Sequence, residues 1–156
     1  MIVAIGADHA GYPLKPRIMA AIADAGHEIS DVGAHDLDPD DDYPDYARLV
    51  ATAIAHGNAD RGVLVCGSGV GAAVAACKVP GVRASVAHDT FSARQGVEDD
   101  DVNVLALGAR VIGPELAADV TIAFLAARFS DAERHVRRLT KVIEIERDAL
   151  AGEFDR

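Results

Sequence analysis

Cys66 stands directly before a glycine-rich turn, CGSGVG at 66–71, in which every second residue is glycine. Glycines let the backbone turn tightly and let a ligand approach the amides. A helix that starts at such a turn adds unpaired N–H groups and the positive end of its dipole, which together stabilise an oxyanion. We expect these groups to lower the pKa of the Cys66 thiol, so that it acts as a base near neutral pH.

The turn has three interpretations on local sequence alone. In the first, Cys66 ends a buried strand and the glycines only reverse the chain. In the second, Gly67-x-Gly69-x-x-Ala72 is a relaxed dinucleotide fingerprint, with Asp89 at a suitable distance beyond the next strand. In the third, the turn is an anion nest in which Cys66 serves as base or nucleophile.

Other candidates for chemistry lie in three further segments. Asp8 and His9 follow the first predicted strand in GADHAG at 6–11, where they face a cleft or serve as a helix cap and a surface histidine. Arg134 and Arg138 are four residues apart, so they share one helix face, and guanidinium groups suit a phosphate. The alternative is a solvated face that balances nearby acidic residues. Arg110 is a candidate anion contact or an ordinary loop arginine.

These residues need a scaffold of alternating strands and helices. The pattern predicts strands at 1–8, 27–33, 61–67, 82–89 and 102–108 and helices at 12–26, 45–57, 70–79, the first part of 90–100, 113–129 and about 131–150. This order predicts a single α/β domain over 1–156, a Rossmann-like, doubly wound, five-stranded parallel sheet with a long C-terminal helix. Ligands bind beyond the carboxyl ends of such strands, where the candidate residues fall.

The composition excludes several classes of function. The formal net charge of −10 opposes binding to nucleic acid or to an anionic membrane. Acidic residues cluster at 36–45 and 98–101, which we expect to be solvated loops or helix termini. Two cysteines, Cys66 and Cys77, fit neither a zinc motif nor a disulfide framework, which favours a reduced, cytoplasmic protein. The N-terminus is not a signal peptide, and no apolar run reaches the roughly 18 residues of a membrane span.

Five motifs in order resemble the ribose-5-phosphate isomerase B family: GADHAG, DYPDYA, VCGSGVGAAVAACKVPGVRAS, NVLALGARVIG and ERHVRRL. Relatives of that family include galactose-6-phosphate isomerase subunits and isomerases of tetrulose phosphates. The resemblance covers nearly the whole chain and displaces the dinucleotide interpretation. It implies an enzyme that interconverts aldose and ketose phosphates without metal or cofactor, as a homodimer or a dimer of dimers.

The resemblance also implies roles for individual residues. Cys66 is the base that moves a proton between C1 and C2, and Ser68 hydrogen-bonds to substrate oxygens. The enediolate oxygen is held by the amides of the turn, at Gly67, Gly69, Val70 and Gly71. Asp8 and Tyr43 line the sugar site. The phosphate is bound by His9, Arg110, Arg134 and Arg138, with contributions from both subunits.

One position departs from the family pattern. Pentose-specific members carry a ring-opening histidine just before the NVLALG-like strand, where this chain has Asp99, and the neighbouring asparagine position is Asp100. An aspartate is ordinarily ionised near neutral pH and is then a poor acid. Three explanations remain open. The substrate is an acyclic tetrulose phosphate that needs no ring opening, or another group opens the ring, either Asp99 with a raised pKa or His88. In the third, the chain is an impaired or engineered pentose enzyme.

We take ribose 5-phosphate as the leading substrate and the tetrulose phosphate as the alternative. Two rivals from other classes remain, a nucleotide-binding or regulatory module and a silent homologue that only binds phosphosugars. An apolar stripe on the last predicted helix is expected to pack on the domain or on a second subunit; it consists of Val136, Leu139, Val142, Ile143 and Leu150.

Overall fold

The computed structural model of the protein describes residues 1–153. Five strands and six helices alternate in the predicted order over these residues. The strands are β1 (Ile2–Ala7), β2 (Glu28–Gly33), β3 (Arg61–Cys66), β4 (Ala84–Val86) and β5 (Val104–Gly108). The helices are α1 (Lys15–Asp24), α2 (Tyr43–Ala55), α3 (Val70–Ala76), α4 (Thr90–Asp100), α5 (Pro114–Ala126) and α6 (Glu133–Ala151).

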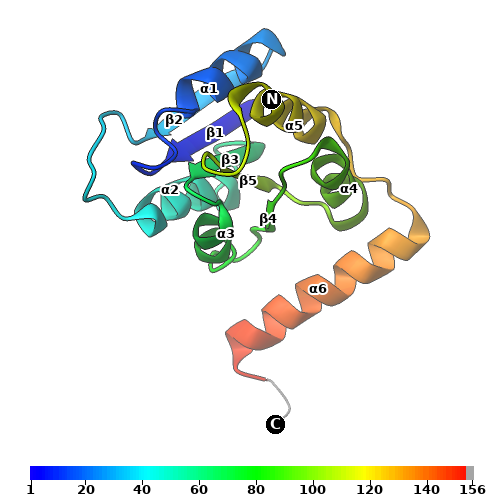
Figure 1. Ribbon diagram of the computed structural model, residues 1–156. Coiled ribbons are helices and arrows are strands. Elements are labelled where there is room, and N and C mark those ends of the chain that lie inside the picture. The colour runs from blue at the N-terminus through cyan, green and yellow to red at the C-terminus, as the bar shows by residue number, and fades with distance from the viewer. Residues whose placement is uncertain (154–156) are drawn as a thin grey trace.

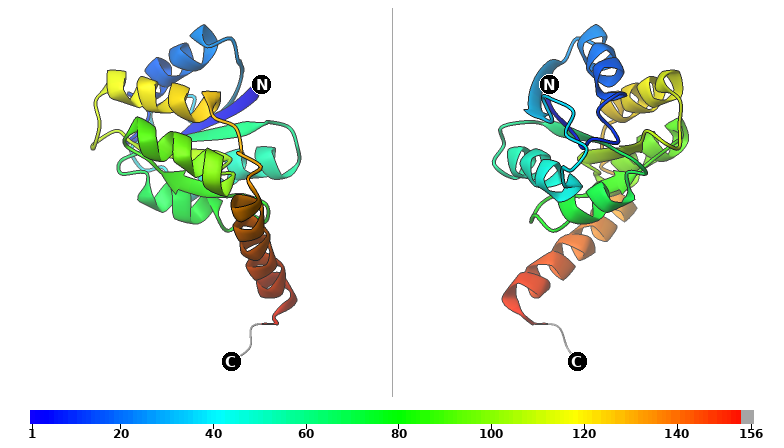
Figure 2. Two further views of the ribbon diagram at one scale, coloured as in Figure 1. Left: turned by 90° about the vertical axis from the view of Figure 1, so that its right-hand side faces the viewer. Right: turned by 60° about the vertical axis from the view of Figure 1, so that its left-hand side comes forward.

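The strands form one parallel sheet in the order β2-β1-β3-β5-β4, which confirms the doubly wound Rossmann-like fold. Helices α1, α4 and α5 cover one face of the sheet, and α2 and α3 cover the other (Figures 1 and 2). The strand order reverses between β1 and β3, and ligands bind at such a point. Cys66 ends β3 at that position.

Two apolar layers hold the sheet between its helices. In β3, Val63 and Val65 pack with α1, α4 and α5, while Leu64 and Cys66 pack with α2 and α3. A strand that is buried on both faces reads as a continuous apolar run, and GVLVC, the buried part of β3, is such a run. The Cys66 side chain therefore lies on the α2–α3 side of the sheet.

Several boundaries differ from the sequence prediction, most clearly around β4 and α4. The strand predicted at 82–89 is only Ala84–Val86, because the chain turns so that Asp89 caps α4. The Asp89 carboxylate accepts a hydrogen bond from the Ser92 amide over 2.7 Å, and this bond lowers the pKa of Asp89. Helix α4 continues through Asp100, so the acidic cluster at 98–101 lies at the end of a helix.

Helix α6 leaves the body of the molecule after packing its first turns near α4 (Figures 1 and 2). Several apolar side chains of α6 are exposed, among them Val142, Ile143, Ile145 and Leu150. None of the helices in residues 1–153 combines the length and apolarity that a membrane crossing requires.

Candidate active site

The glycine turn after β3 needs glycine for its backbone conformation and for space. Gly69 adopts a φ of 81°, and an added Cβ would lie 3.1 Å from the Leu107 backbone. Residues with a side chain rarely adopt this conformation. At Gly71 an added Cβ would lie 2.8 Å from the Tyr43 ring. The turn thus packs against β5 on one side and against Tyr43 on the other. Only glycines leave enough space there for the turn to form an anion nest.

Cys66 is paired with a carboxylate from the first βα turn. Its Sγ donates a hydrogen bond to Oδ2 of Asp8 over 2.8 Å, and both residues are buried. The second oxygen of Asp8 accepts a hydrogen bond from the Gly11 amide, also over 2.8 Å. Because β1 and β3 are neighbours, their carboxyl ends bring together two residues that are 58 positions apart.

The pKa of Cys66 moves opposite to the sequence prediction. Burial raises the pKa of the thiol, and the neighbouring carboxylate of Asp8 raises it further. The amides of Gly69 and Gly67 lower this pKa, as the turn predicted, but their effect is smaller. A buried thiolate beside a carboxylate is costly on two counts, so the expectation of a lowered pKa was wrong. The resting sulfur is a protonated thiol whose proton points at Asp8.

A cavity of about 360 Å³ opens beside this pair. The residues that line it come from the turns after β1, β3 and β5 and from the starts of α2 and α3: Asp8, His9, Ala10, Tyr43, Cys66, Gly67, Ser68, Gly71, Arg110 and Val111. The structure therefore brings together most of the residues that the sequence placed at the sugar. Gly69 and Val70 belong to the same turn without lining the cavity, and the Val70 amide donates to Ser68 Oγ over 3.3 Å.

His9 has a buried partner that the sequence analysis missed. Its Nδ1 lies 2.6 Å from Oδ1 of Asp41, and its amide donates to the same oxygen over 3.0 Å. This hydrogen bond raises the pKa of His9, which favours the imidazolium form. The Asp41 side chain is only 6% exposed, whereas we expected its acidic loop to be solvated. Nothing in the sequence distinguishes Asp41 from the acidic residues beside it.

Arg110 is carried to the cavity by the loop after β5. Its amide donates to the Gly67 carbonyl over 3.0 Å, and its guanidinium would lie 3.6 Å from a Cβ added at Gly67. His88 lies behind this loop, where its Nε2 accepts a hydrogen bond from the Gly108 amide over 2.9 Å. An Nε2 that accepts this bond carries no proton to give, so His88 is held as a structural acceptor.

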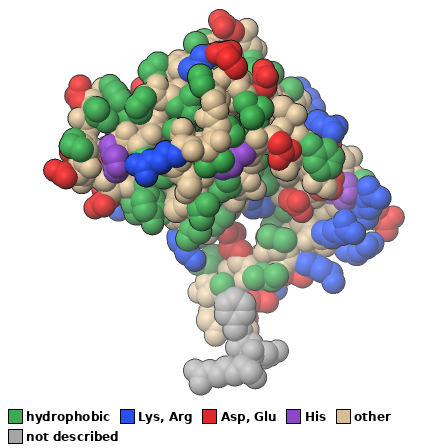
Figure 3. All heavy atoms as spheres, viewed as in Figure 1, with side chains coloured by type: hydrophobic (Ala, Val, Ile, Leu, Met, Phe, Trp, Pro, Cys, Tyr) green, Lys and Arg blue, Asp and Glu red, His purple; other side chains and the backbone are tan. Residues whose placement is uncertain are grey.

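The remaining predicted residues lie elsewhere in the chain. Asp99 faces His135 on α6, and Asp100 lines a groove between α6 and the body of the molecule. Arg134 and Arg138 are exposed on α6, where Lys and Arg side chains gather (Figure 3). None of these residues lines the cavity beside Cys66. Within residues 1–153 of one chain, the phosphate arginines of α6 and the thiol therefore occupy separate places.

The fold and the cavity together define a class of protein. A thiol–carboxylate pair at an amide-rich turn is suited to moving a proton at a carbon whose neighbouring oxygen becomes negative. His9 and Arg110 add cationic groups for a small anionic ligand at the same cavity. This combination is typical of an α/β enzyme for proton transfer on a small anion.

The comparisons with known proteins agree with that class. The sequence model of the Ribose/Galactose Isomerase family matches residues 3–142. Ribose-5-phosphate isomerase B of Escherichia coli (strain K12) is 42% identical over 144 residues, 92% of this chain and 95% of that protein. D-erythrulose-4-phosphate isomerase of Pectobacterium atrosepticum is 42% identical over 127 residues, 81% of this chain and 84% of that protein.

A solved structure extends the agreement to the fold. Ribose-5-phosphate isomerase B from Clostridium thermocellum matches with a TM-score of 0.91 at 43% identity, covering 96% of this chain and 99% of that chain. The chain belongs to the ribose/galactose isomerase family, as the motifs predicted. It is an aldose–ketose isomerase, that is, an intramolecular oxidoreductase that acts on a sugar phosphate.

Proposed function

We propose that the chain interconverts ribose 5-phosphate and ribulose 5-phosphate, with Cys66 moving a proton through an enediolate. The observation that carries the mechanism is the hydrogen bond of 2.8 Å from Cys66 Sγ to Asp8 at the glycine turn. The substrate choice is supported by the ribose-5-phosphate isomerases B among the relatives, which match over almost their whole length.

The proton moves within a small set of groups. Asp8 takes the thiol proton, and the Cys66 thiolate then removes the proton from C2 of the open-chain aldose. The electron pair forms the C1–C2 double bond, and the former aldehyde oxygen becomes the enediolate oxygen, held by the amides of the turn. Cys66 returns its proton to C1 while the C2 hydroxyl becomes the ketone and its proton passes to O1. Atoms and electrons balance without a cofactor.

The phosphate end of the substrate is held by His9 and Arg110 in this chain. Asp41 keeps His9 oriented and favours its cationic form, which pairs with the phosphate. Fixing the phosphate also fixes C1 and C2 relative to Cys66, which turns binding energy into correct orientation.

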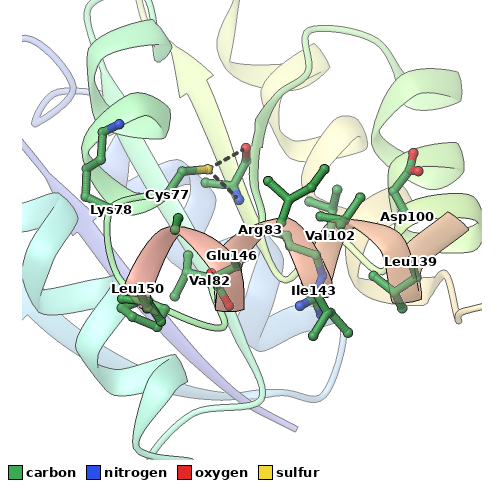
Figure 4. A pocket seen from close by; sticks show the side chains of 15 residues that line it. Cys77, Lys78, Val82, Arg83, Asp100, Val102, Leu139, Ile143, Glu146 and Leu150 are labelled. Atoms are coloured by element: carbon green, nitrogen blue, oxygen red, sulfur yellow. Dashed lines mark hydrogen bonds between the residues drawn. The ribbon is translucent and has the colours of Figure 1, made fainter. Parts of the chain in front are cut away.

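A second copy of the chain completes this proposal by supplying Arg134 and Arg138 from its α6. Support comes from the apolar groove of about 590 Å³ between α6 and the body (Figure 4). Val82, Val102, Leu139 and Ile143 are among the residues that line it. A large exposed apolar surface of this kind marks an interaction site. We therefore expect a homodimer, or a dimer of dimers built from it.

An acyclic tetrulose phosphate is the second candidate substrate. Two observations favour it: Asp99 stands where pentose-specific members carry a ring-opening histidine, and one relative is a D-erythrulose-4-phosphate isomerase. A four-carbon ketose phosphorylated at C4 does not close to a furanose, so its isomerisation requires no ring-opening acid.

Proton NMR in deuterated buffer tests both the reaction and the substrate. The wild-type protein is incubated with ribose 5-phosphate and, separately, with D-erythrulose 4-phosphate. Conversion of ribose 5-phosphate with deuterium uptake at the reacting carbon supports the leading proposal, and turnover of the tetrulose phosphate alone supports the second. Cys66→Ala is expected to lower the rate about 10²–10⁴-fold, while Cys77→Ala, the same change at the other cysteine, retains it. Binding without deuterium uptake would instead indicate the silent homologue.

A further inference from the structure

The start of α6 is tied to α4 through a buried histidine. His135 is 3% exposed, and its Nδ1 lies 2.6 Å from Ser130 Oγ and 3.4 Å from Oδ1 of Asp99. On the other edge of the ring, Nε2 accepts a hydrogen bond from Nε of Arg134 over 2.9 Å. A connected polar network therefore runs from α4 to the exposed arginine of α6.

These contacts determine the tautomer of His135. A guanidinium nitrogen only donates, so Nε2 must be the unprotonated acceptor of the ring. The single ring proton is then on Nδ1, which is hydrogen-bonded to Ser130 Oγ over 2.6 Å and has the Asp99 carboxylate 3.4 Å away. A negative charge beside Nδ1 favours this tautomer over the alternative, in which the proton on Nε2 would face the Arg134 Nε–H.

Arg134 is held through its Nε, which a bidentate contact with phosphate does not require. Its Nε is bound to His135, and within residues 1–153 its guanidinium makes no further hydrogen bond or ion pair. The two terminal nitrogens remain for a bidentate contact with an oxyanion. The side chain is exposed on α6, one turn before Arg138.

Neither carboxylate oxygen of Asp99 is left without a contact inside the protein. Its Oδ1 faces His135 Nδ1, and its Oδ2 accepts a hydrogen bond from Gln95 Nε2 over 3.1 Å. One oxygen accepts a hydrogen bond and the other lies beside the buried imidazole, an arrangement that suits an acceptor-only carboxylate.

We propose that Asp99, through His135, is a positioning residue for Arg134 and thereby for the phosphate of the substrate, and that it is not the acid that opens a furanose ring. The inference rests on the proposed function, because it assigns Arg134 to the substrate phosphate. It gives Asp99 the same role for cyclic and acyclic substrates.

Titration calorimetry with inorganic phosphate on the full-length protein tests the positioning role. Asp99→Ala is expected to weaken phosphate binding about three- to tenfold, the effect of losing one oriented hydrogen bond. Glu98→Ala is the matched control, because it removes the same charge one residue earlier on α4, away from His135. Removing a negative charge by itself strengthens the binding of an anion, so the control is expected to bind phosphate as well as or better than wild type.

A double-mutant cycle connects the effect to Arg134. In an Arg134→Ala background, Asp99→Ala is expected not to weaken phosphate binding further, because the group that it positions is gone, and only the gain from the lost negative charge remains. In steady-state kinetics, Asp99→Ala is expected to raise KM by a similar factor for ribose 5-phosphate and D-erythrulose 4-phosphate, whichever of them the wild type converts, with kcat nearly unchanged. A ring-opening acid would instead lower kcat for ribose 5-phosphate alone.

The inference is overturned if Asp99→Ala binds phosphate like Glu98→Ala, if its effect persists without Arg134, or if kcat falls only on the furanose substrate. Circular dichroism confirms that each variant is folded before titration. A wild-type protein that binds no phosphate would overturn the proposed function itself, and that result is seen before any variant is made.

Discussion

Gly11 is the position at which a single methyl group is expected to damage both the fold and the site. A Cβ added there would lie 2.0 Å from the Val65 carbonyl oxygen and 2.7 Å from the Cys66 amide nitrogen. Real Cβ atoms essentially never come within 3.0 Å of such atoms. The neighbours are backbone atoms of β3, the central strand, so they have no rotamer by which to move aside.

Gly11→Ala therefore requires the first βα turn to move by about 1 Å from β3, and overpacking of this kind costs about 3 kcal/mol. For a chain of this size that cost corresponds to a melting temperature about 6–12 °C lower. Because the Gly11 amide holds Asp8, the shift also carries the carboxylate away from Cys66. A misplacement of this size in an active site lowers turnover by about 10²-fold.

Thermal unfolding followed by circular dichroism measures the loss, with Gly113→Ala as the matched control. Gly113 has a φ of −76° and an added Cβ there meets nothing within 4 Å, so alanine fits. Both substitutions restrict the unfolded chain equally, which leaves the clash as the difference. The two proteins are compared at one concentration, because assembly shifts melting temperatures. Melting temperatures that agree within about 2 °C would refute the reasoning.

Further predictions concern the electrostatics and the assembly of the site. Asp8→Asn removes the carboxylate that raises the pKa of Cys66, so iodoacetamide should alkylate this thiol faster near neutral pH. Mass spectrometry measures the alkylation rate, and an unchanged rate would contradict the pairing of Asp8 with Cys66. Asp41 raises the pKa of His9, so phosphate affinity should fall as the pH rises through that pKa. Asp41→Asn should move this fall in affinity to lower pH. Phosphate titrations at several pH values test the shift, and an unchanged pH profile would contradict the role of Asp41. Ile143→Glu charges the apolar groove and should yield monomers with impaired turnover in sedimentation and activity assays, whereas an intact dimer would remove the groove from the interface.

The element order and the place of the thiol were predictable from local sequence. Short apolar runs that alternate with amphipathic segments specify a parallel sheet, and Cys66 ends one of these runs. The turn after it carries glycines that the structure requires at Gly69 and Gly71. The boundaries of helices and strands were less predictable where a single side chain sets them. Asp89 is an example, because its carboxylate caps α4 and the chain therefore leaves β4 earlier than the sequence predicted.

The electrostatics of the site were not predictable from local sequence. The pKa of Cys66 depends on burial and on Asp8, which comes from a different strand, whereas the turn alone indicates the opposite direction. Asp41 looks like any member of an acidic loop until the fold buries it against His9. His135 reads as part of a basic cluster, yet it is among the most buried polar residues of the chain. In each case the deciding contact joins segments that the sequence separates.

Asp8 and the glycine turn act on Cys66 with opposite signs, and the reaction requires both. The carboxylate raises the pKa of the thiol and so keeps the resting sulfur protonated, and it becomes a neutral acid once it has taken the thiol proton, so it does not repel the enediolate. The amides of Gly67 and Gly69 lower the pKa of the same thiol and offer N–H groups to the enediolate anion. A proton that passes from the sulfur to Asp8 leaves the negative charge on the pair, and removal of the C2 proton by the thiolate then transfers that charge to the substrate. The charge that appears on the substrate therefore arises beside the turn, where the amides already point.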